Sequence, residues 1–145
     1  MKARRHRQFR VNKITTPLLR KIKVYMAKTI LVIDDDEDIL EILNIVFQDS
    51  GYEVILSRIG LETDFINVLH PDIVLLDVRI VGSPKTGADI CKDLKADVRT
   101  KHMPVILFSA EHDLHTMATA CEADSYIAKP FGIDSLLMQV QKQLS

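Results

Sequence analysis

From residue 28 onward, short continuous apolar runs alternate with segments whose apolar residues recur three and four positions apart. The continuous runs cover residues 29–33, 54–56, 73–76, 105–108 and 126–127. Such runs, rich in Val, Ile and Leu, are typical of strands buried on both faces of a sheet. The segments between and after them predict five helices. The apolar residues whose spacing indicates these helices are, in order, Ile39, Ile42, Leu43 and Val46; Leu61, Phe65, Val68 and Leu69; Ile90, Cys91 and Leu94; Leu114, Met117, Ala118 and Cys121; and Ile133, Leu136, Leu137, Val140 and Leu144.

Five strand–helix units in succession predict an α/β fold, a doubly wound parallel sheet of five strands with helices on both faces. In such sheets, ligands bind beyond the carboxyl ends of the strands, at the point where the strand order reverses. The residues that directly follow each strand are therefore the first candidates for a functional site.

Acidic residues, a hydroxyl and an amine follow the predicted strands. They are Asp34, Asp35 and Asp36 after the first strand, Asp77 after the third, Ser109 after the fourth and Lys129 after the fifth. Carboxylates crowded at one edge of a sheet repel one another unless a cation lies between them. Ligands that are all oxygen favour a hard divalent ion, Mg²⁺ or Mn²⁺ in its place, which also binds phosphate oxygens. Glu37 and Asp38 have a simpler explanation, because acidic residues are favoured at the N-terminus of a helix.

Four segments place these residues in a known pattern. They are Ile-Leu-Val-Ile-Asp-Asp-Asp-Glu-Asp (30–38), Pro-Asp-Ile-Val-Leu-Leu-Asp (71–77), Val-Ile-Leu-Phe-Ser-Ala (105–110) and Ala-Asp-Ser-Tyr-Ile-Ala-Lys-Pro-Phe (123–131). Through them, residues 28–145 resemble the receiver domain of two-component response regulators, in particular the single-domain chemotaxis regulators. The resemblance implies a flavodoxin-like sheet of strand order 2-1-3-4-5 with five helices.

The resemblance also implies how a phosphoryl group is handled. Asp77 would be the phosphoacceptor, Ser109 would hydrogen-bond the phosphoryl group, and Lys129 would form an ion pair with it. Tyr126 matches the aromatic switch position, so phosphorylation would change the surface of the fourth helix, fifth strand and fifth helix. The Lys129–Pro130 peptide bond would be cis, a conformation that is common only before proline.

A magnesium site is implied at the same place. Asp35 would bind Mg²⁺ directly and Asp34 through water, with Asp77 and the backbone carbonyl of Arg79 as further ligands. Arg79 and Glu111 lie two positions after Asp77 and Ser109, beside the route by which water would reach the phosphoryl group. Since both side chains are long and oppositely charged, we expect them to obstruct water and to slow dephosphorylation.

Two departures from the family pattern stand out. The loop Val78–Thr86 is about two residues longer than is usual, with Pro84 displaced, so its course is left open. Gly132 occupies the position where an acidic cap is common, so we expect the last helix to begin late.

Charge divides the chain into two parts. Residues 1–27 hold nine Lys and Arg and no acidic residue, whereas residues 28–145 hold ten Lys and Arg and twenty Asp and Glu. We therefore expect a basic N-terminal extension at 1–27, disordered or non-native, before a receiver domain at 28–145. An alternative is an amphipathic helix, with Ile14, Leu18, Ile22 and Tyr25 at helical spacing, that binds a membrane or nucleic acid.

Composition excludes several other classes. The chain of 145 residues is 47% hydrophobic, but no apolar run approaches the roughly 20 residues that cross a bilayer. Cys91 and Cys121 lack zinc-ligand spacing and fit a cytoplasmic protein. The histidines at positions 70, 102, 112 and 115 lie in predicted loops or helix ends, without a ligand set at useful spacing.

The function expected from these features is that of a phosphoacceptor module in a two-component phosphorelay. Its partners would be a sensor histidine kinase or histidine phosphotransfer protein and a downstream protein target, without direct DNA binding by residues 28–145. The transfer would be to the protein itself, which is not conventional enzyme turnover. The alternative is a small haloacid-dehalogenase-type phosphohydrolase that uses Asp34 as nucleophile, with Asp36, Ser109 and Lys129, although it leaves Asp77 without a role. A degenerate receiver that serves only for docking is disfavoured by the intact acidic set.

Overall fold

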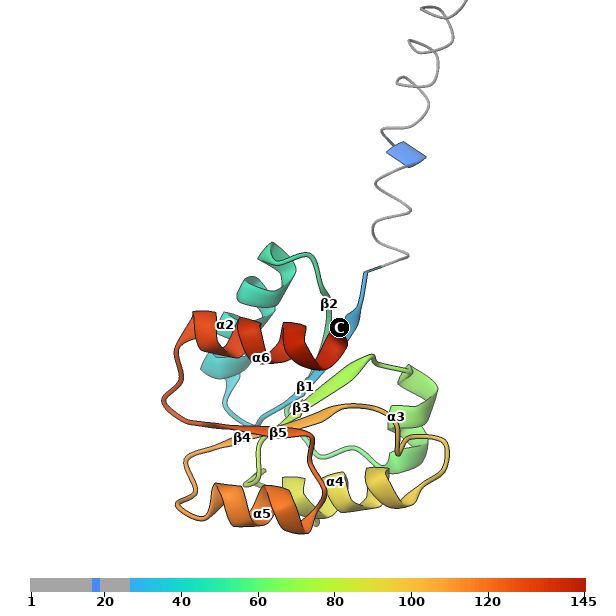
Figure 1. The fold of residues 1–145 in the computed structure, drawn as a ribbon, viewed down its shortest axis with the longest axis vertical. Coiled ribbons are helices and arrows are strands. Elements are labelled where there is room, and N and C mark those ends of the chain that lie inside the picture. The colour runs from blue at the N-terminus through green and yellow to red at the C-terminus, as the bar shows by residue number, and fades with distance from the viewer. Residues whose placement is uncertain (1–16, 19–26) are drawn as a thin grey trace, which may run out of the picture.

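A single parallel sheet forms the centre of the fold. The computed structural model of the chain describes residues 17–18 and 27–145. The strands are β1 (Thr29–Ile33), β2 (Glu53–Ser57), β3 (Ile73–Leu76), β4 (Val105–Ser109) and β5 (Ser125–Ala128). Their order is β2-β1-β3-β4-β5, so the predicted doubly wound sheet is confirmed, with its switch point between β1 and β3 (Figure 1).

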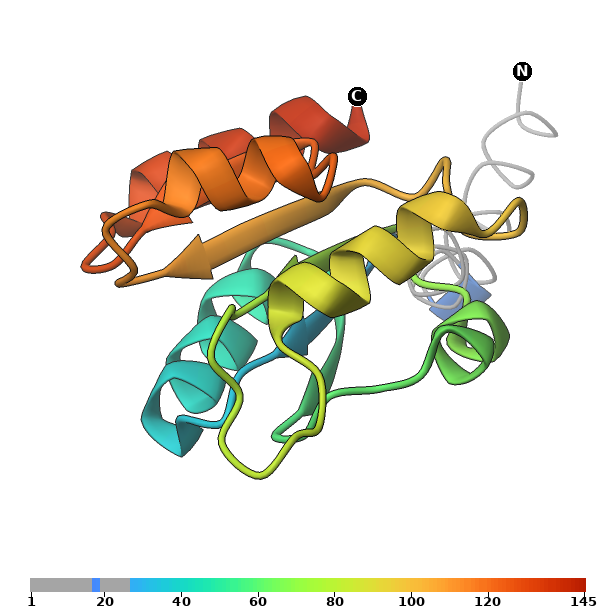
Figure 2. The same ribbon diagram turned by 90° about the horizontal axis from the view of Figure 1, so that it is seen from below.

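Helices cover both faces of this sheet. They are α2 (Glu37–Asp49), α3 (Thr63–Leu69), α4 (Gly87–Ala96), α5 (Leu114–Ala120) and α6 (Ile133–Leu144). Helices α2 and α6 pack on one face, and α3, α4 and α5 pack on the other, where α4 and α5 lie in front when the molecule is seen from below (Figure 2). The sheet therefore separates two hydrophobic cores.

Burial on both faces explains the apolar runs of the central strands. Every residue of β3 and β4 is buried, and so is β1 from Ile30 onward. Successive side chains of a strand point to opposite faces, so Ile30 lies in the core beneath α2 and α6, and Leu31 lies in the other core. Strands β2 and β5 form the edges and are less completely buried.

Not every apolar residue whose spacing indicated a helix faces the core. In α2 the buried residues are Leu40, Leu43 and Phe47, whereas Ile42 is 49% exposed. In α3 only Ile66 is buried, and Phe65 and Val68, whose spacing indicated this helix, are exposed. These helices carry apolar residues around more than one side, so the three-and-four spacing fits two stripes, and contact with the sheet decides which stripe is buried.

Side-chain hydrogen bonds cap the N-termini of α2 and α4, whereas α6 begins without one. The Asp36 side chain accepts hydrogen bonds from the backbone N–H groups of Asp38 and Ile39 and so caps α2. Thr86 and Asp89 form a reciprocal capping box at the start of α4. Helix α6 begins at Ile133, directly after Gly132, which is itself the N-cap and offers no side-chain hydrogen bond, so the expected late start is wrong.

Several other expectations concern the chain as a whole. Cys91 and Cys121 are both free and buried, and burial raises the pKa of the Cys91 thiol, as expected for core residues. Among residues 17–18 and 27–145, no helix has the length and apolar content to cross a bilayer. Almost all of the basic segment 1–27, including the amphipathic pattern predicted there, lies outside the described residues.

Candidate functional site

An acidic pocket lies at the carboxyl ends of the strands. Its volume is about 270 Å³, and it is lined by Asp34, Asp35, Asp36, Asp77, Arg79, Ser109, Ala110, Glu111 and Lys129. Strand register explains why residues from distant parts of the sequence meet there. Ile33 pairs with Leu76, and Ser109 pairs with Ala128, so the next residues along these strands emerge side by side at one edge of the sheet.

Lys129 connects two carboxylates across this pocket. Its Nζ lies 2.7 Å from Asp34 Oδ2 and 3.1 Å from Asp77 Oδ2. The same Nζ lies 4.7 Å from the ring centroid of Phe108, a fully buried residue that comes directly before Ser109. Burial alone lowers the pKa of Lys129, but the hydrogen bonds and charges of the two carboxylates outweigh it and raise the pKa, so the amine stays an ammonium.

Asp34 is the most deeply buried acid of the pocket, with a relative exposure of 0%. Burial raises the pKa of Asp34, and the nearby Asp77 carboxylate adds to the effect, while hydrogen bonds from Lys129 and the Asp36 backbone oppose it. The Asp36 N–H donates to Asp34 Oδ1 at 2.9 Å, so both carboxylate oxygens of Asp34 already have a protein partner. Asp34 is therefore held in place from two sides.

Asp35 reaches the pocket from the same turn, and a long loop contacts it. The Val81 N–H donates to Asp35 Oδ2 at 3.2 Å, which ties the loop 78–86 to this carboxylate. Asp34, Asp35 and Asp77 each offer an oxygen atom within 4.8 Å of the other two. Three carboxylates at this separation fit a hard divalent cation, and Asp35 is the one that has no contact with Lys129 among the hydrogen bonds of the described residues.

A backbone contact positions Asp77. A Cβ at position 87 would overlap the Asp77 carbonyl oxygen and lie 2.7 Å from its carbonyl carbon, so only glycine fits there without a shift of the backbone. The Gly87 N–H also donates to the Val78 carbonyl at 2.7 Å, and the Asp77 N–H donates to the Ile33 carbonyl at 2.9 Å. The start of α4 is thus packed directly against the peptide of Asp77.

Ser109, Glu111 and Arg79 form another wall of the pocket. Ser109 is buried, and its Oγ accepts a hydrogen bond from the Glu111 N–H at 3.3 Å. The Glu111 Oε1 lies 3.5 Å from the Arg79 Nε, so the ion pair predicted across the mouth of the pocket is present. This pair is largely exposed and contributes little to stability, but it stands between the pocket and solvent.

Tyr126 lies outside the pocket. Its side chain is 41% exposed, and its ring is tilted against that of His115 on α5, with 5.2 Å between the ring centroids. The Lys129–Pro130 peptide bond that follows β5 is cis, as the family resemblance implied. The sequence placed Tyr126 on the short fifth strand, but it gave no sign of the contact with His115.

A second hollow, of about 530 Å³, adjoins the acidic pocket. Ala110 and Lys129 line both, and the rest of the second hollow is apolar, with Ile39 and Ile42 from α2 on one side and Pro130, Phe131 and Ile133 on the other. Ile42 and Ile133 are exposed there. An apolar surface thus borders the polar pocket.

The structure brings the predicted site residues Asp34, Asp35, Asp77, Ser109 and Lys129 together, and Arg79 also lines the pocket. Sequence reasoning missed three contributors: Phe108 beneath the ammonium, Gly87 against the Asp77 peptide, and the Val81 N–H on Asp35. Phe108 was detectable as the last apolar residue before Ser109. The other two depend on how the long loop returns to the sheet, which spacing does not reveal.

The fold and the pocket together define a class of protein, a doubly wound α/β domain with an acidic pocket and a lysine at its switch point. Comparison with known proteins then identifies the family within this class. The family model of the response regulator receiver domain matches residues 30–141, and the chain belongs to that family.

Known relatives and structures agree with this assignment. The DNA-binding response regulator MtrA of Mycolicibacterium paratuberculosis is 34% identical over 122 residues, which cover 82% of this chain and 52% of that protein. This chain therefore spans about half the length of such relatives. A putative response regulator from Chloroflexus aurantiacus has a TM-score of 0.72 at 28% identity, covering 81% of this chain and 98% of that one. The chemotaxis protein CheY4 of Vibrio cholerae has a TM-score of 0.73 at 25% identity, and the match covers 81% of this chain and 99% of that one.

Proposed function

We propose that the chain is the phosphoacceptor module of a two-component phosphorelay and that Asp77 receives the phosphoryl group. The observation that carries the proposal is the convergence of Asp77, Lys129 and Ser109 in one pocket, with the ammonium 3.1 Å from the Asp77 carboxylate. A carboxylate beside an ammonium and a hydroxyl has both the nucleophile and the groups that stabilise a transferred phosphoryl group.

In the proposed reaction, an Asp77 carboxylate oxygen attacks the phosphorus atom of the donor. The bond from phosphorus to the donor, a histidine nitrogen in a kinase, breaks as the new acyl phosphate bond forms. Lys129 keeps its positive charge and offsets negative charge on the phosphoryl oxygens, and the Ser109 hydroxyl donates a hydrogen bond to one of them. The Phe108 ring beneath Lys129 holds the ammonium from its other side.

Asp35, Asp34 and Asp77 are the residues that would hold a divalent cation, with the Arg79 carbonyl as a further ligand. Their mutual spacing within 4.8 Å supports this assignment. When bound, Mg²⁺ would supply positive charge to the phosphoryl oxygens. We assign direct ligation to Asp35 and contact through water to Asp34, because both oxygens of Asp34 already have protein partners.

The donor is proposed to be a histidine kinase or a histidine phosphotransfer protein. Such a partner must cover the mouth of the acidic pocket to bring its phosphohistidine to Asp77. The apolar hollow lined by Ile39, Ile42 and Ile133 shares Lys129 with that pocket and so lies where the partner would contact the domain. The output is proposed to be a second protein surface, formed by α5, β5 and α6, on which Tyr126 is exposed.

The proposed conformational switch begins when the Ser109 hydroxyl changes its hydrogen-bond partner. Ser109 Oγ now accepts the Glu111 N–H, and a phosphoryl group on Asp77 would recruit the same hydroxyl. Movement of Ser109 would displace the segment that leads to α5, together with His115, which contacts Tyr126. We propose that Tyr126 then turns toward the space that Ser109 vacates, which changes the exposed surface.

The haloacid-dehalogenase alternative gains no support. Its second acid, Asp36, lines the pocket, but one of its carboxylate oxygens caps α2 by accepting the backbone N–H groups of Asp38 and Ile39. Its nucleophile, Asp34, is completely buried and held by Lys129. For nucleic acid, the excess of acidic residues in 28–145 works against DNA binding by this part, whatever the MtrA relatives do elsewhere in their length.

Incubation with acetyl phosphate and Mg²⁺, followed by intact mass measurement, tests the proposal. We expect one phosphoryl adduct on the wild-type chain, none on Asp77→Asn, partial labelling of Asp34→Asn, and normal labelling of the exposed control Asp49→Asn. Labelling that survives in Asp77→Asn and is lost in Asp34→Asn would contradict the proposal and favour the hydrolase.

A further inference from the structure

Two histidines that are distant in the sequence line one hollow at the amino ends of β3 and β4, the end of the sheet opposite to the acidic pocket. His70 and His102 each lie three residues before the strand that follows them. Because β3 and β4 are parallel neighbours, with Val74 opposite Val105, the segments that enter them run side by side. Both histidines line one hollow of about 140 Å³, together with Pro71, Asp72, Arg99 and Pro104.

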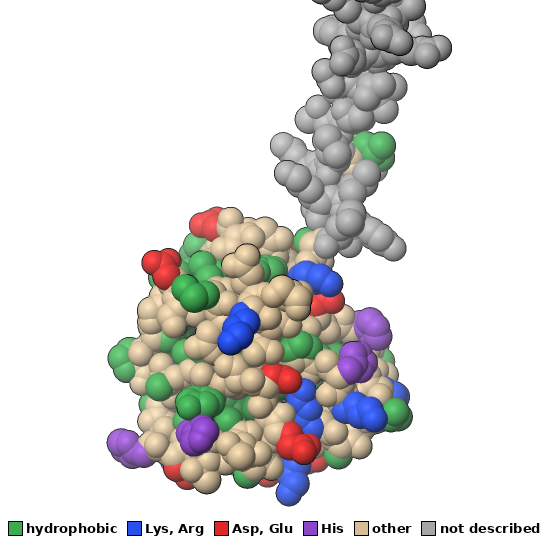
Figure 3. Space-filling view, viewed as in Figure 1, with side chains coloured by type: hydrophobic (Ala, Val, Ile, Leu, Met, Phe, Trp, Pro, Cys, Tyr) green, Lys and Arg blue, Asp and Glu red, His purple; other side chains and the backbone are tan. Residues whose placement is uncertain are grey.

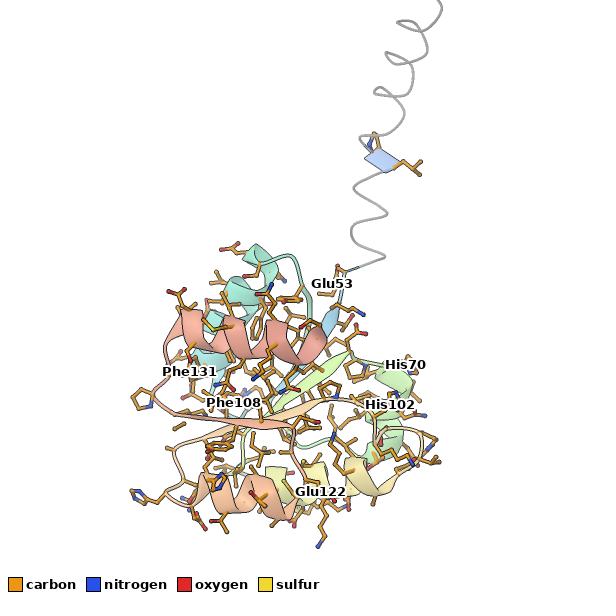
Figure 4. All side chains as sticks on the ribbon, viewed as in Figure 1. Glu53, His70, His102, Phe108, Glu122 and Phe131 are labelled. Atoms are coloured by element: carbon orange, nitrogen blue, oxygen red, sulfur yellow. The ribbon has the colours of Figure 1, made fainter. Side chains whose placement is uncertain are left out.

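Both imidazoles are accessible from solvent. Figure 3 shows two histidine side chains as neighbouring groups on this surface, and Figure 4 labels His70 and His102 there. Both residues are exposed, so water reaches the space between and around the rings. Sequence spacing gave no hint of the pair, because the sheet register brings the two residues together.

The ring of His70 is already oriented. Its Nδ1 lies 3.2 Å from the Asn67 carbonyl oxygen, a contact in which Nδ1 carries the proton and donates it. The lone pair is then on Nε2, at the far side of the ring. A histidine whose Nδ1–H is bound to a backbone carbonyl, with Nε2 left open, has the arrangement of histidines that ligate metals. The backbone is fixed as well, because the His70 N–H donates to the Ile66 carbonyl at 3.1 Å.

The charges around the hollow are paired with one another. Arg99 lines the hollow, but its guanidinium is bound to Asp97 at 2.8 Å and to Asp64 at 2.6 Å, and these carboxylates offset its charge. Asp72 adds a carboxylate to the wall. One of its oxygens accepts the Thr29 N–H at 2.7 Å, and the other forms an exposed ion pair with the Lys28 Nζ at 3.9 Å, a contact that a bound cation would replace.

We propose that His70 and His102 bind a divalent transition-metal ion of the zinc type at the amino end of the sheet, with Asp72 beside them and water completing the coordination. Imidazole nitrogen suits zinc, copper and nickel, whereas magnesium prefers oxygen ligands, so this site differs in metal class from the acidic pocket. Among the described residues, only Asp34, Asp35 and Asp77 of the acidic pocket offer three ligand atoms within 4.8 Å of one another. The proposed site therefore has two protein ligands, His70 and His102.

Binding here would have a structural effect. His70 ends α3 and precedes β3, whereas His102 belongs to the connection from α4 to β4. A metal held by both would join these two connections, and because the unfolded chain does not hold the two rings together, it would stabilise the folded state.

Titration of the full chain with Zn²⁺ in excess Mg²⁺ tests the proposal, with calorimetry for affinity and ¹H–¹⁵N NMR for location. We expect one Zn²⁺ per chain and shifts confined to residues around 67–72 and 99–104. His70→Asn and His102→Asn should each weaken binding about tenfold or more, since even the loss of an outer partner of a ligand costs that much. Asparagine tolerates the left-handed backbone of position 70, where φ is 56°, so the variant keeps its fold.

The exposed His112 supplies the matched control, and His112→Asn should bind Zn²⁺ as the wild type does. Three results would each overturn the proposal: no binding to the wild type at about 1 mM Zn²⁺, equal affinity in both histidine variants, or NMR shifts confined to the acidic pocket. The outcome does not depend on Asp77 or on phosphorylation.

Discussion

At the scale of single residues, Asp34 and Lys129 show how the pocket balances burial against charge. Asp34 is fully buried, and its Oδ2 depends on the same ammonium as Asp77. Asp34→Asn should raise the free energy of unfolding of the metal-free protein at pH 7 by about 1 kcal/mol, because the amide removes a desolvated charge that faces a second carboxylate. Lys129 keeps Asp77 as its charged partner.

The pH dependence of the wild type should follow from the same cause. Since burial raises the pKa of Asp34, the folded protein takes up this proton before the unfolded chain does as the pH falls. Stability from this group therefore rises as the pH falls through the folded-state pKa, and it falls as the pH rises through it. The advantage of Asp34→Asn should shrink toward acid pH, as urea unfolding over a pH series would measure. A variant less stable than wild type at pH 7 would show that Lys129 requires both carboxylates.

Gly87 is the second residue with a direct consequence for the site. Gly87→Ala places a Cβ against the Asp77 carbonyl, and backbone atoms cannot rotate away as a side chain does. We expect a loss of about 3 kcal/mol in unfolding free energy, together with slower labelling of Asp77 by acetyl phosphate in the protein that remains folded. Gly132→Ala is the control, because nothing lies within 4 Å of its added Cβ. Equal stability of both variants in urea would contradict this account.

Residues that follow strands were predictable, and residues that act through loops were not. Asp77 and Lys129 could be identified because a buried strand leaves no choice about where its next residue emerges. Gly87 was recognised only as a loop residue, since its role arises from a contact with a peptide ten positions earlier in the chain. His70 and His102 were set aside for the same reason, because their proximity comes from strand pairing.

At the scale of elements, the β3–α4 and β4–α5 loops meet across the mouth of the acidic pocket through Arg79 and Glu111. Their two long side chains stand where water would approach a phosphoryl group in line with its bond to Asp77. We expect slow autodephosphorylation of the wild type and faster loss of phosphate from Arg79→Asn and Glu111→Ala, measured on purified labelled protein in excess Mg²⁺.

An ion pair outside the pocket gives the control for this prediction. Arg58 and Glu37 are in contact at 2.6 Å and are similarly exposed, but neither lines the acidic pocket. Arg58→Asn should leave the rate of phosphate loss unchanged. Equal or slower loss from both pocket variants would show that the Arg79–Glu111 pair does not obstruct water.

The elements themselves were largely predictable, but the faces of the helices were less so. The strand positions follow from continuous apolar runs, which only a sheet covered on both faces can bury. Helix α2 carries enough apolar residues for two stripes, and its packing on the sheet buries Phe47 and exposes Ile42. The exposed stripe contributes to a second feature of the surface, because Ile42 lines the apolar hollow next to the acidic pocket.

At the scale of the whole molecule, the two proposed cation sites occupy opposite ends of the same strands. The acidic pocket uses oxygen ligands at the carboxyl ends, and the histidine pair uses nitrogen ligands at the amino ends of β3 and β4. The two sites share no residue, so excess Mg²⁺ can be used to occupy the acidic pocket while Zn²⁺ is titrated at the histidine pair. Each thus provides an internal control for the other.

The separation of the two cores by the sheet has a consequence for how such a domain can be altered. The apolar hollow beside the pocket belongs to the side of α2 and α6, whereas Leu107, the partner of Tyr126 in β4, belongs to the side of α4 and α5. The proposed donor contact on α2 and the contact of Tyr126 with α5 therefore lie on opposite faces of the sheet, whereas α6 takes part in both proposed surfaces. We therefore expect substitutions on α2 to change the choice of donor with little effect on the response, and substitutions on α5 to do the reverse.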